Sequence, residues 1–137
     1  MDEWNELLDA YACEMEIASA GYEMMGRMLD HRAVISRLKE NELTEFYIYG
    51  GGYLGIQLYQ AVYNEINVIS IVDKNAGLVI DLPNIPVLGL EEFENQYAGQ
   101  HVVITPAKFY IPIKKYLSRF VPEERILCLG ELIGGVL

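Results

Sequence analysis

Residues 46–55 read FYIYGGGYLG, an apolar run that ends in three glycines and passes directly into a helix-period pattern. Gly50, Gly52 and Gly55 fit the G-x-G-x-x-G spacing of a dinucleotide-binding turn. That spacing is a weak signal alone and gains weight between a strand and a helix, with an acidic residue about 20 positions further on. This chain meets all three conditions, because the next apolar run, 67–72, is followed directly by Asp73. The stretch therefore predicts the first strand, turn and helix of a parallel α/β fold.

The glycine spacing suits the binding of a phosphate. The first glycine permits a tight turn out of the strand, the second lets the backbone approach a pyrophosphate, and the third lets the helix pack close to the strand. Unpaired N–H groups and the positive end of the helix dipole then face the phosphates. We therefore expect cofactor binding at residues 50–55, which include Gly51, Tyr53 and Leu54. Tyr53 and Leu54 could equally be packing residues. The alternative for the whole turn is a glycine-rich loop that binds nothing.

Two further turns are expected beside the glycines. Asp73 can accept hydrogen bonds from ribose hydroxyls, and its charge favours a ribose with a free 2′-hydroxyl. Lys74 next to it weakens that preference, and a solvated turn is the alternative. Thr105 closes another buried apolar run, and Pro106 follows it. Its hydroxyl is a candidate donor to a phosphate or a sugar.

From residue 45 onward, strand-like runs alternate with helix-period segments. Strands are expected at 46–49, 68–72, 85–88, 101–105 and 125–129, and helices at 53–65, 90–97 and 108–120. This alternation predicts a parallel sheet with right-handed crossovers. We expect a Rossmann-like, three-layer α/β fold of about five strands in the order 3-2-1-4-5. The ligand crevice then lies at the carboxyl ends of the first and fourth strands, where the strand order reverses.

The first 44 residues are expected to form an N-terminal helical segment, separate from a nucleotide-binding domain at 45–137. From Trp4 to Leu29, apolar residues recur at alternating spacings of four and three, which is a heptad seam. The seam favours a homodimer through the N-terminal helix. A long helix that packs its stripe on its own domain explains the seam equally well. A second short helix is expected at 32–39, ended by Asn41.

The composition of the chain limits its possible partners and its cellular location. A net charge of -10 over 137 residues argues against nucleic acid and anionic membrane surfaces as partners. No apolar stretch reaches the length of a membrane span, and the acidic start lacks the basic region of a signal peptide. We expect a cytoplasmic protein without a metal site, in which Cys13 and Cys128 are reduced thiols.

One apparent catalytic pair is rejected. Tyr110 and Lys114 form Y-x-x-x-K, the acid–base spacing of short-chain dehydrogenases. Pro112 lies between them, the pair follows the glycines too closely for that family, and no serine stands at the usual distance before it. No Ser-His-Asp set or carboxylate pair offers another mechanism, so no catalytic residue is assigned.

From Tyr47 onward, the segments YIYGGGYLGIQLYQAV, VISIVDKN, IPVLGLEEF and HVVITP resemble a Rossmann-like domain of bacterial sugar and cell-surface biosynthesis. Its relatives include the N-terminal domain of sugar acetyltransferases and the domain that precedes nucleotide-sugar dehydratases and epimerases. The resemblance implies NAD(P) or a UDP-sugar bound by Gly50 to Leu54 and Asp73. It also implies that the catalytic residues belong to partner domains.

The sequence thus predicts a nucleotide-binding module, in nucleotide-sugar or cell-surface polysaccharide metabolism, without a complete catalytic site. Two alternatives stay open. The first is a small NAD-dependent oxidoreductase or nucleotide-sugar-modifying subunit that acts at a dimer interface. The second is an interaction protein whose glycine turn is vestigial.

Overall fold

The computed structural model describes residues 31–79, 82, 84–105 and 110–129 of the chain. Within them, five parallel strands pair in the order β3-β2-β1-β4-β5. This confirms the predicted α/β, Rossmann-like sheet and its 3-2-1-4-5 order. The elements are α2 (His31–Glu40), β1 (Glu45–Tyr49), α3 (Tyr53–Val62), β2 (Asn67–Val72), the 3-10 turn η1 (Ala76–Leu78), β3 (Val87–Leu88), α4 (Leu90–Gln96), β4 (His101–Ile104), α5 (Tyr110–Leu117), the 3-10 turn η2 (Glu123–Arg125) and β5 (Ile126–Cys128).

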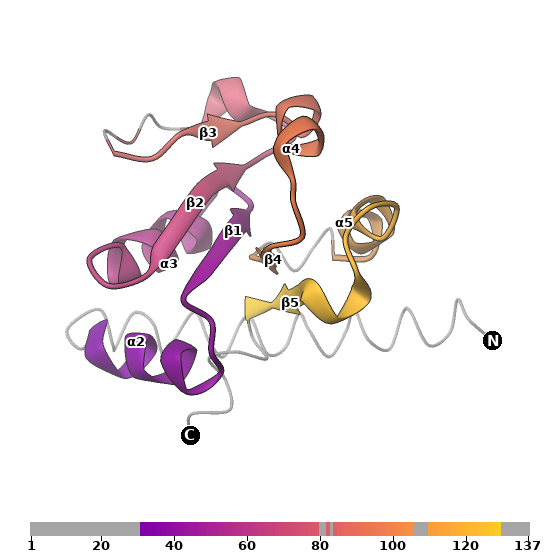
Figure 1. The fold of residues 1–137 in the computed structure, drawn as a ribbon. Helices are drawn as coiled ribbons and strands as arrows, with labels where there is room; N and C mark the ends of the chain where they lie inside the picture. Colours follow the sequence, from indigo (N-terminus) through magenta and orange to yellow (C-terminus); the bar gives the residue numbers. More distant parts are fainter. Residues whose placement is uncertain (1–30, 80–81, 83, 106–109, 130–137) are drawn as a thin grey trace.

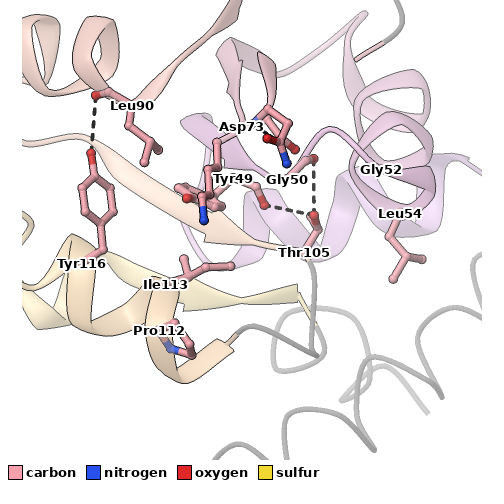
Figure 2. A pocket seen from close by; sticks show the side chains of 12 residues that line it. Tyr49, Gly50, Gly52, Leu54, Asp73, Leu90, Thr105, Pro112, Ile113 and Tyr116 are labelled. Atoms are coloured by element: carbon pink, nitrogen blue, oxygen red, sulfur yellow. Dashed lines mark hydrogen bonds between the residues drawn. The ribbon is translucent and has the colours of Figure 1, made fainter. Parts of the chain in front are cut away.

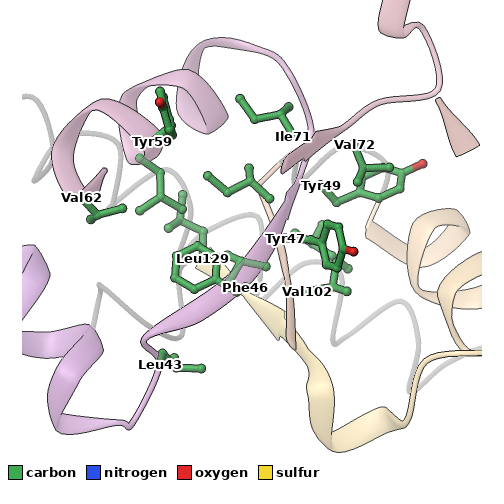
Figure 3. Packing of buried hydrophobic residues seen from close by; sticks show 14 of the residues in the cluster. Leu43, Phe46, Tyr47, Tyr49, Tyr59, Val62, Ile71, Val72, Val102 and Leu129 are labelled. Carbon is green, nitrogen blue, oxygen red and sulfur yellow. The ribbon is translucent and has the colours of Figure 1, made fainter. Parts of the chain in front are cut away.

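Helices cover both faces of the sheet, with α2 and α3 on one face and α4 and α5 on the other (Figure 1). The central strand β1 is buried after its first residue, as a strand covered on both faces should be. Its side chains alternate between the faces. Phe46 points toward α2 and α3, whereas Tyr47 points the opposite way (Figure 3). The Tyr47 ring packs edge-on against Phe93 of α4, with 4.8 Å between the ring centroids.

The pairing of β1 with β2 contains a register shift. Phe46 pairs with Val68 and Tyr49 pairs with Val72, so β2 carries one extra residue between these two pairs. Such a bulge re-aims the residues that follow it. Because Tyr49 is level with Val72, Asp73 comes to lie beside the glycine turn that follows β1.

Several elements end earlier or start later than the sequence predicts. α5 ends at Leu117 and not at residue 120, and β5 covers Ile126–Cys128 and not the whole of 125–129. α3 ends at Val62 and not near residue 65, and its C-cap is Tyr63.

β3 covers Val87–Leu88 only, and not the whole of 85–88. β3 is an edge strand, and Pro86 directly before it has no backbone N–H to donate to the ladder. The short η1 occupies part of residues 75–84, between the second and third strands, where the sequence is compatible with a variable loop or a short hairpin.

The helix α2 packs on the same core as the sheet. Val34, Ile35 and Leu38 are buried members of the hydrophobic cluster that also contains the β1 residues. Asn41 follows the helix, and its side-chain amide donates to the carbonyl of Arg37 at 2.8 Å. The division of the chain at residue 44 and the dimerisation seam stay predictions, because residues 1–30 lie outside the described ranges.

The prediction of a reduced thiol is wrong for Cys128. This residue ends β5, is 2% exposed and is disulfide-bonded. Distance along the chain says nothing about whether two Cα atoms meet the spacing that a disulfide requires, so the wide separation of the cysteines in sequence misleads. Cys13 lies outside the described residues.

The turn between β1 and α3 sets how closely the helix approaches the strand. Gly50 has a φ of 116°, a backbone conformation that residues with a Cβ rarely adopt. Its N–H donates to the carbonyl of Val72 at 2.8 Å. A Cβ on Gly55 would overlap the carbonyl oxygen of Gly50, which is backbone and cannot move aside. Gly55 therefore permits the packing of α3 on the end of β1.

We expect Gly55→Ala to destabilise the fold by about 3 kcal/mol or more, at the upper end of the range for overpacking substitutions. The measurement is urea unfolding followed by circular dichroism. Gly77→Ala is the matched control, because a Cβ at Gly77 has no neighbour within 4 Å. Equal stabilities of the two variants would contradict this account of the turn.

Candidate functional site

The N-terminus of α3 is open to solvent at Gly52. This residue is the N-cap in an extended conformation, makes no side-chain cap and is exposed. The first hydrogen bond of the helix runs from the N–H of Ile56 to the carbonyl of Gly52, at 3.1 Å. The N–H groups of the preceding turn therefore have no partner within the helix. A Cβ at Gly52 would have no neighbour within 4 Å, so a ligand can approach the backbone closely.

Asp73 ties the glycine turn to the end of β2. Its Oδ2 accepts from the N–H of Gly51 at 2.7 Å, and its Oδ1 accepts from the N–H of Asn75 at 2.7 Å. Hydrogen bonds to a charged carboxylate are among the stronger ones. Each oxygen retains a second lone pair that a ribose hydroxyl can use. Asp73 is therefore an anchor of the turn as well as a candidate ligand contact.

The middle glycine is packed and not open. A Cβ on Gly51 would lie 2.5 Å from Cγ2 of Val79, in the segment after η1. Val79 therefore covers Gly51 on one side while Asp73 holds its N–H. The G-x-G-x-x-G spacing leaves this position unspecified, and in this chain close packing explains the glycine.

Thr105 joins the ends of β1 and β4. Its side chain is 2% exposed, and its hydroxyl donates to the carbonyl of Tyr49 at 3.0 Å and lies 3.4 Å from that of Gly50. Its own N–H donates to the same Tyr49 carbonyl at 3.0 Å. The hydroxyl that the sequence offers as a phosphate or sugar donor is thus bonded within the protein.

A cavity of about 780 Å³ opens at the carboxyl ends of these strands (Figure 2). Its volume falls within the usual range for small-molecule sites, about 300–1,000 Å³. The predicted site residues on its wall are Gly50, Gly52, Leu54, Asp73, Lys74 and Thr105. Gly51 and Gly55 do not line the cavity. Gly51 is bonded to Asp73, and Gly55 packs against the carbonyl of Gly50. Pro106 and the side chain of Tyr53 lie outside the described part of the structure.

Six further residues line the cavity without having been singled out from the sequence. They are Tyr49, Asn75, Leu90, Pro112, Ile113 and Tyr116. Three of them lie on α5, the helix that follows the fourth strand. The sequence did carry a signal for α5. The strand order reverses between the first and fourth strands, so the helix that follows the fourth strand begins beside the crevice.

Two tyrosines in the cavity are held in the neutral state. Burial raises the pKa of Tyr49, and the Asp73 carboxylate raises it further. Burial also raises the pKa of Tyr116, to about 12, with further contributions from the charge and hydrogen bond of Glu94. The Tyr116 hydroxyl lies 3.4 Å from the carbonyl oxygen of Leu90 (Figure 2). Neither phenol can act as an anionic base near neutral pH.

The Y-x-x-x-K pair is not on the cavity wall. Tyr110 is 9% exposed, and the Lys114 ammonium lies 5.7 Å from the centroid of its ring. The same ammonium lies 3.8 Å from the carboxylate of Glu123. Both side chains have structural partners, and neither lines the cavity.

Comparisons of the chain with protein-family models, curated proteins and solved structures found no match. Across the described ranges, no group of three or more His, Cys, Asp or Glu side chains is arranged to hold a metal ion. None of the described helices combines the length and the hydropathy that crossing a bilayer requires. What the cavity can do must therefore be argued from its own residues.

We expect Asp73→Asn to destabilise the fold by about 1.5–3 kcal/mol, because an amide replaces one acceptor oxygen with an NH2 group that faces a backbone N–H. Urea unfolding at neutral pH measures the loss. Glu123→Gln is the control: its carboxylate is 82% exposed in a surface ion pair, and such pairs contribute about 0–1 kcal/mol. A loss at Asp73 no larger than that of the control would show that the carboxylate does not anchor the turn.

The raised pKa of Tyr116 predicts a pH-dependent contribution to stability. The folded state holds the phenolic proton up to about pH 12, whereas an unfolded tyrosine loses it near its ordinary value of 10.0. The contribution is fully present below pH 10 and is lost as the pH rises toward 12. The stability advantage of the unaltered chain over Tyr116→Phe should therefore fall between pH 10 and pH 12, measured by urea unfolding. A constant difference over that window would contradict the assignment.

Proposed function

We propose that this chain is a nucleotide-binding, Rossmann-like module whose ligand is NAD(P) or a UDP-sugar. The observation that carries the proposal is the open backbone at Gly52, at the N-terminus of α3 and on the wall of a large cavity. A helix N-terminus with free N–H groups attracts phosphate through hydrogen bonds and its dipole. The cavity supplies the enclosed volume that a helix end alone lacks.

The neighbours of the turn support a nucleotide over an isolated phosphate. Asp73 lies at the tip of β2, with lone pairs available to a ribose beside the phosphate position. Lys74 adds a cation to the same wall. A ligand that combines phosphate and ribose matches both features, because each has a partner at the same edge of the sheet.

The described side chains of the cavity favour binding over chemistry. Tyr49 and Tyr116 are neutral, the Thr105 hydroxyl is bonded to backbone, and both oxygens of Asp73 accept backbone N–H groups. None of these groups is placed as a free general base. The setting in bacterial nucleotide-sugar or cell-surface metabolism rests on the motif resemblance. The proposed homodimer rests on the heptad seam.

We expect NAD⁺, NADH, NADP⁺ or a UDP-sugar to raise the melting temperature of the full chain in a thermal-shift screen that also includes coenzyme A. A ligand at 100 times its Kd adds about 2.7 kcal/mol of stability. Gly52→Val should fold and lose this shift, because its methyl groups occupy open space that the phosphate needs. Gly77→Val is the control: it also adds a side chain in open space, but away from the cavity, and should keep the shift.

Two results would replace the proposal with the alternatives. Stabilisation by none of these nucleotides would favour an interaction protein with a vestigial turn. Turnover of a sugar nucleotide, or reduction of NAD⁺, by the purified chain would favour a small oxidoreductase or nucleotide-sugar-modifying subunit. Retention of the shift by Gly52→Val would move the binding site away from the glycine turn.

A further inference from the structure

The side chain of Tyr49 is buried, yet its hydroxyl has no partner within the described part of the protein. Tyr49 is the last residue of β1, is 6% exposed and lines the cavity. Among the described residues, none makes a hydrogen bond to its hydroxyl. In the view of Figure 2, Tyr49 lies between Asp73 and Ile113. A buried polar group without a partner carries a desolvation cost, so its presence at this position requires an explanation.

Two neighbouring tyrosines have hydroxyl groups with partners inside the protein. Tyr47 projects from the same face of β1 as Tyr49 (Figure 3), and its hydroxyl accepts from Nε2 of Gln96 at 3.1 Å. The Tyr116 hydroxyl lies 3.4 Å from the carbonyl oxygen of Leu90. On the described wall of the cavity, the phenol of Tyr49 is therefore the one whose proton is available to a ligand.

The Tyr49 hydroxyl is a hydrogen-bond donor at neutral pH. Burial raises the pKa of Tyr49, and the Asp73 carboxylate raises it further, so the phenol keeps its proton. A ligand that enters the cavity displaces water from this hydroxyl. That ligand loses affinity unless it supplies an acceptor in place of the water.

We propose that the Tyr49 hydroxyl donates a hydrogen bond to the sugar or the base of the bound nucleotide, and that it determines specificity for a ligand with an acceptor at that point. The inference rests on the proposed function, because it takes the phosphates to lie on the glycine turn and the rest of the nucleotide to lie beyond them. The hydroxyl then serves binding and not folding.

A pair of variants on one strand separates binding from folding. Tyr49→Phe removes the oxygen and keeps the ring, so without ligand its melting temperature should equal or exceed that of the unaltered chain. Tyr47→Phe is the matched control and should melt a few degrees lower, because it breaks the bond to Gln96. A decrease for Tyr49→Phe as large as that of the control would show that the hydroxyl supports the fold, and would overturn the inference.

Isothermal titration of the full chain with NAD⁺, NADP⁺ and UDP-glucose measures the binding role. Whichever of them binds the unaltered chain should bind Tyr49→Phe about tenfold more weakly. This change corresponds to about 1.4 kcal/mol, which the loss of one hydrogen bond accounts for. Tyr47→Phe should keep the affinity of the unaltered chain, because Tyr47 does not line the cavity.

Inorganic pyrophosphate separates the phosphates from the rest of the nucleotide. It should compete with the bound nucleotide equally well in the unaltered chain and in Tyr49→Phe. Competition that is about tenfold weaker in Tyr49→Phe would assign the hydroxyl to the phosphates and overturn the inference. Absence of competition in the unaltered chain would contradict the position of the phosphates on the glycine turn, on which the inference rests.

Failure of this inference differs from failure of the proposed function. If none of the three nucleotides binds the unaltered chain, both fail together. If one of them binds the unaltered chain and Tyr49→Phe with equal affinity, the proposed function stands and the role of the Tyr49 hydroxyl is wrong.

Discussion

The close approach of α3 to the end of β1 is the constraint on which the rest of the structure depends. A side chain at residue 55 would meet the carbonyl oxygen of Gly50, so the helix lies where it does only because that side chain is missing. This approach aims the helix N-terminus along the carboxyl edge of the sheet, where Gly52 faces the cavity. The register shift in β2 then brings Asp73 alongside.

Two polar side chains secure this arrangement from opposite sides. Asp73 holds the turn to β2, and Thr105 holds the last residue of β1 to β4. Each therefore forms part of the cavity wall while its own hydrogen-bonding capacity is partly used inside the protein. A site braced in this way is formed before a ligand arrives, so less of the binding free energy is spent on ordering it.

The sequence predicted the order of the strands and the edge at which the cavity lies, because both follow from local periodicity and from the rules for parallel crossovers. It placed Gly50, Gly52 and Asp73 at that edge for the same reason. Other features depend on distances across the fold, which periodicity does not encode. Three such features are the hydrogen bond from Gly51 to Asp73, the packing of Val79 on Gly51 and the part of the cavity wall that α5 forms. The disulfide at Cys128 contradicts an expectation drawn from separation along the chain alone.

Gly52 and Gly55 are constrained by the fold to different degrees. This difference determines which of the two positions can change during evolution. Gly55 is required by the packing of helix on strand, whatever the protein binds. A Cβ at Gly52 would have no neighbour within 4 Å and the backbone there is extended, so packing within the fold does not require glycine at this position. Among related chains of the same fold, residue 55 should therefore stay glycine, whereas other residues are compatible with the fold at residue 52. Variation at residue 52 alone would then mark chains that lack the phosphate site proposed above.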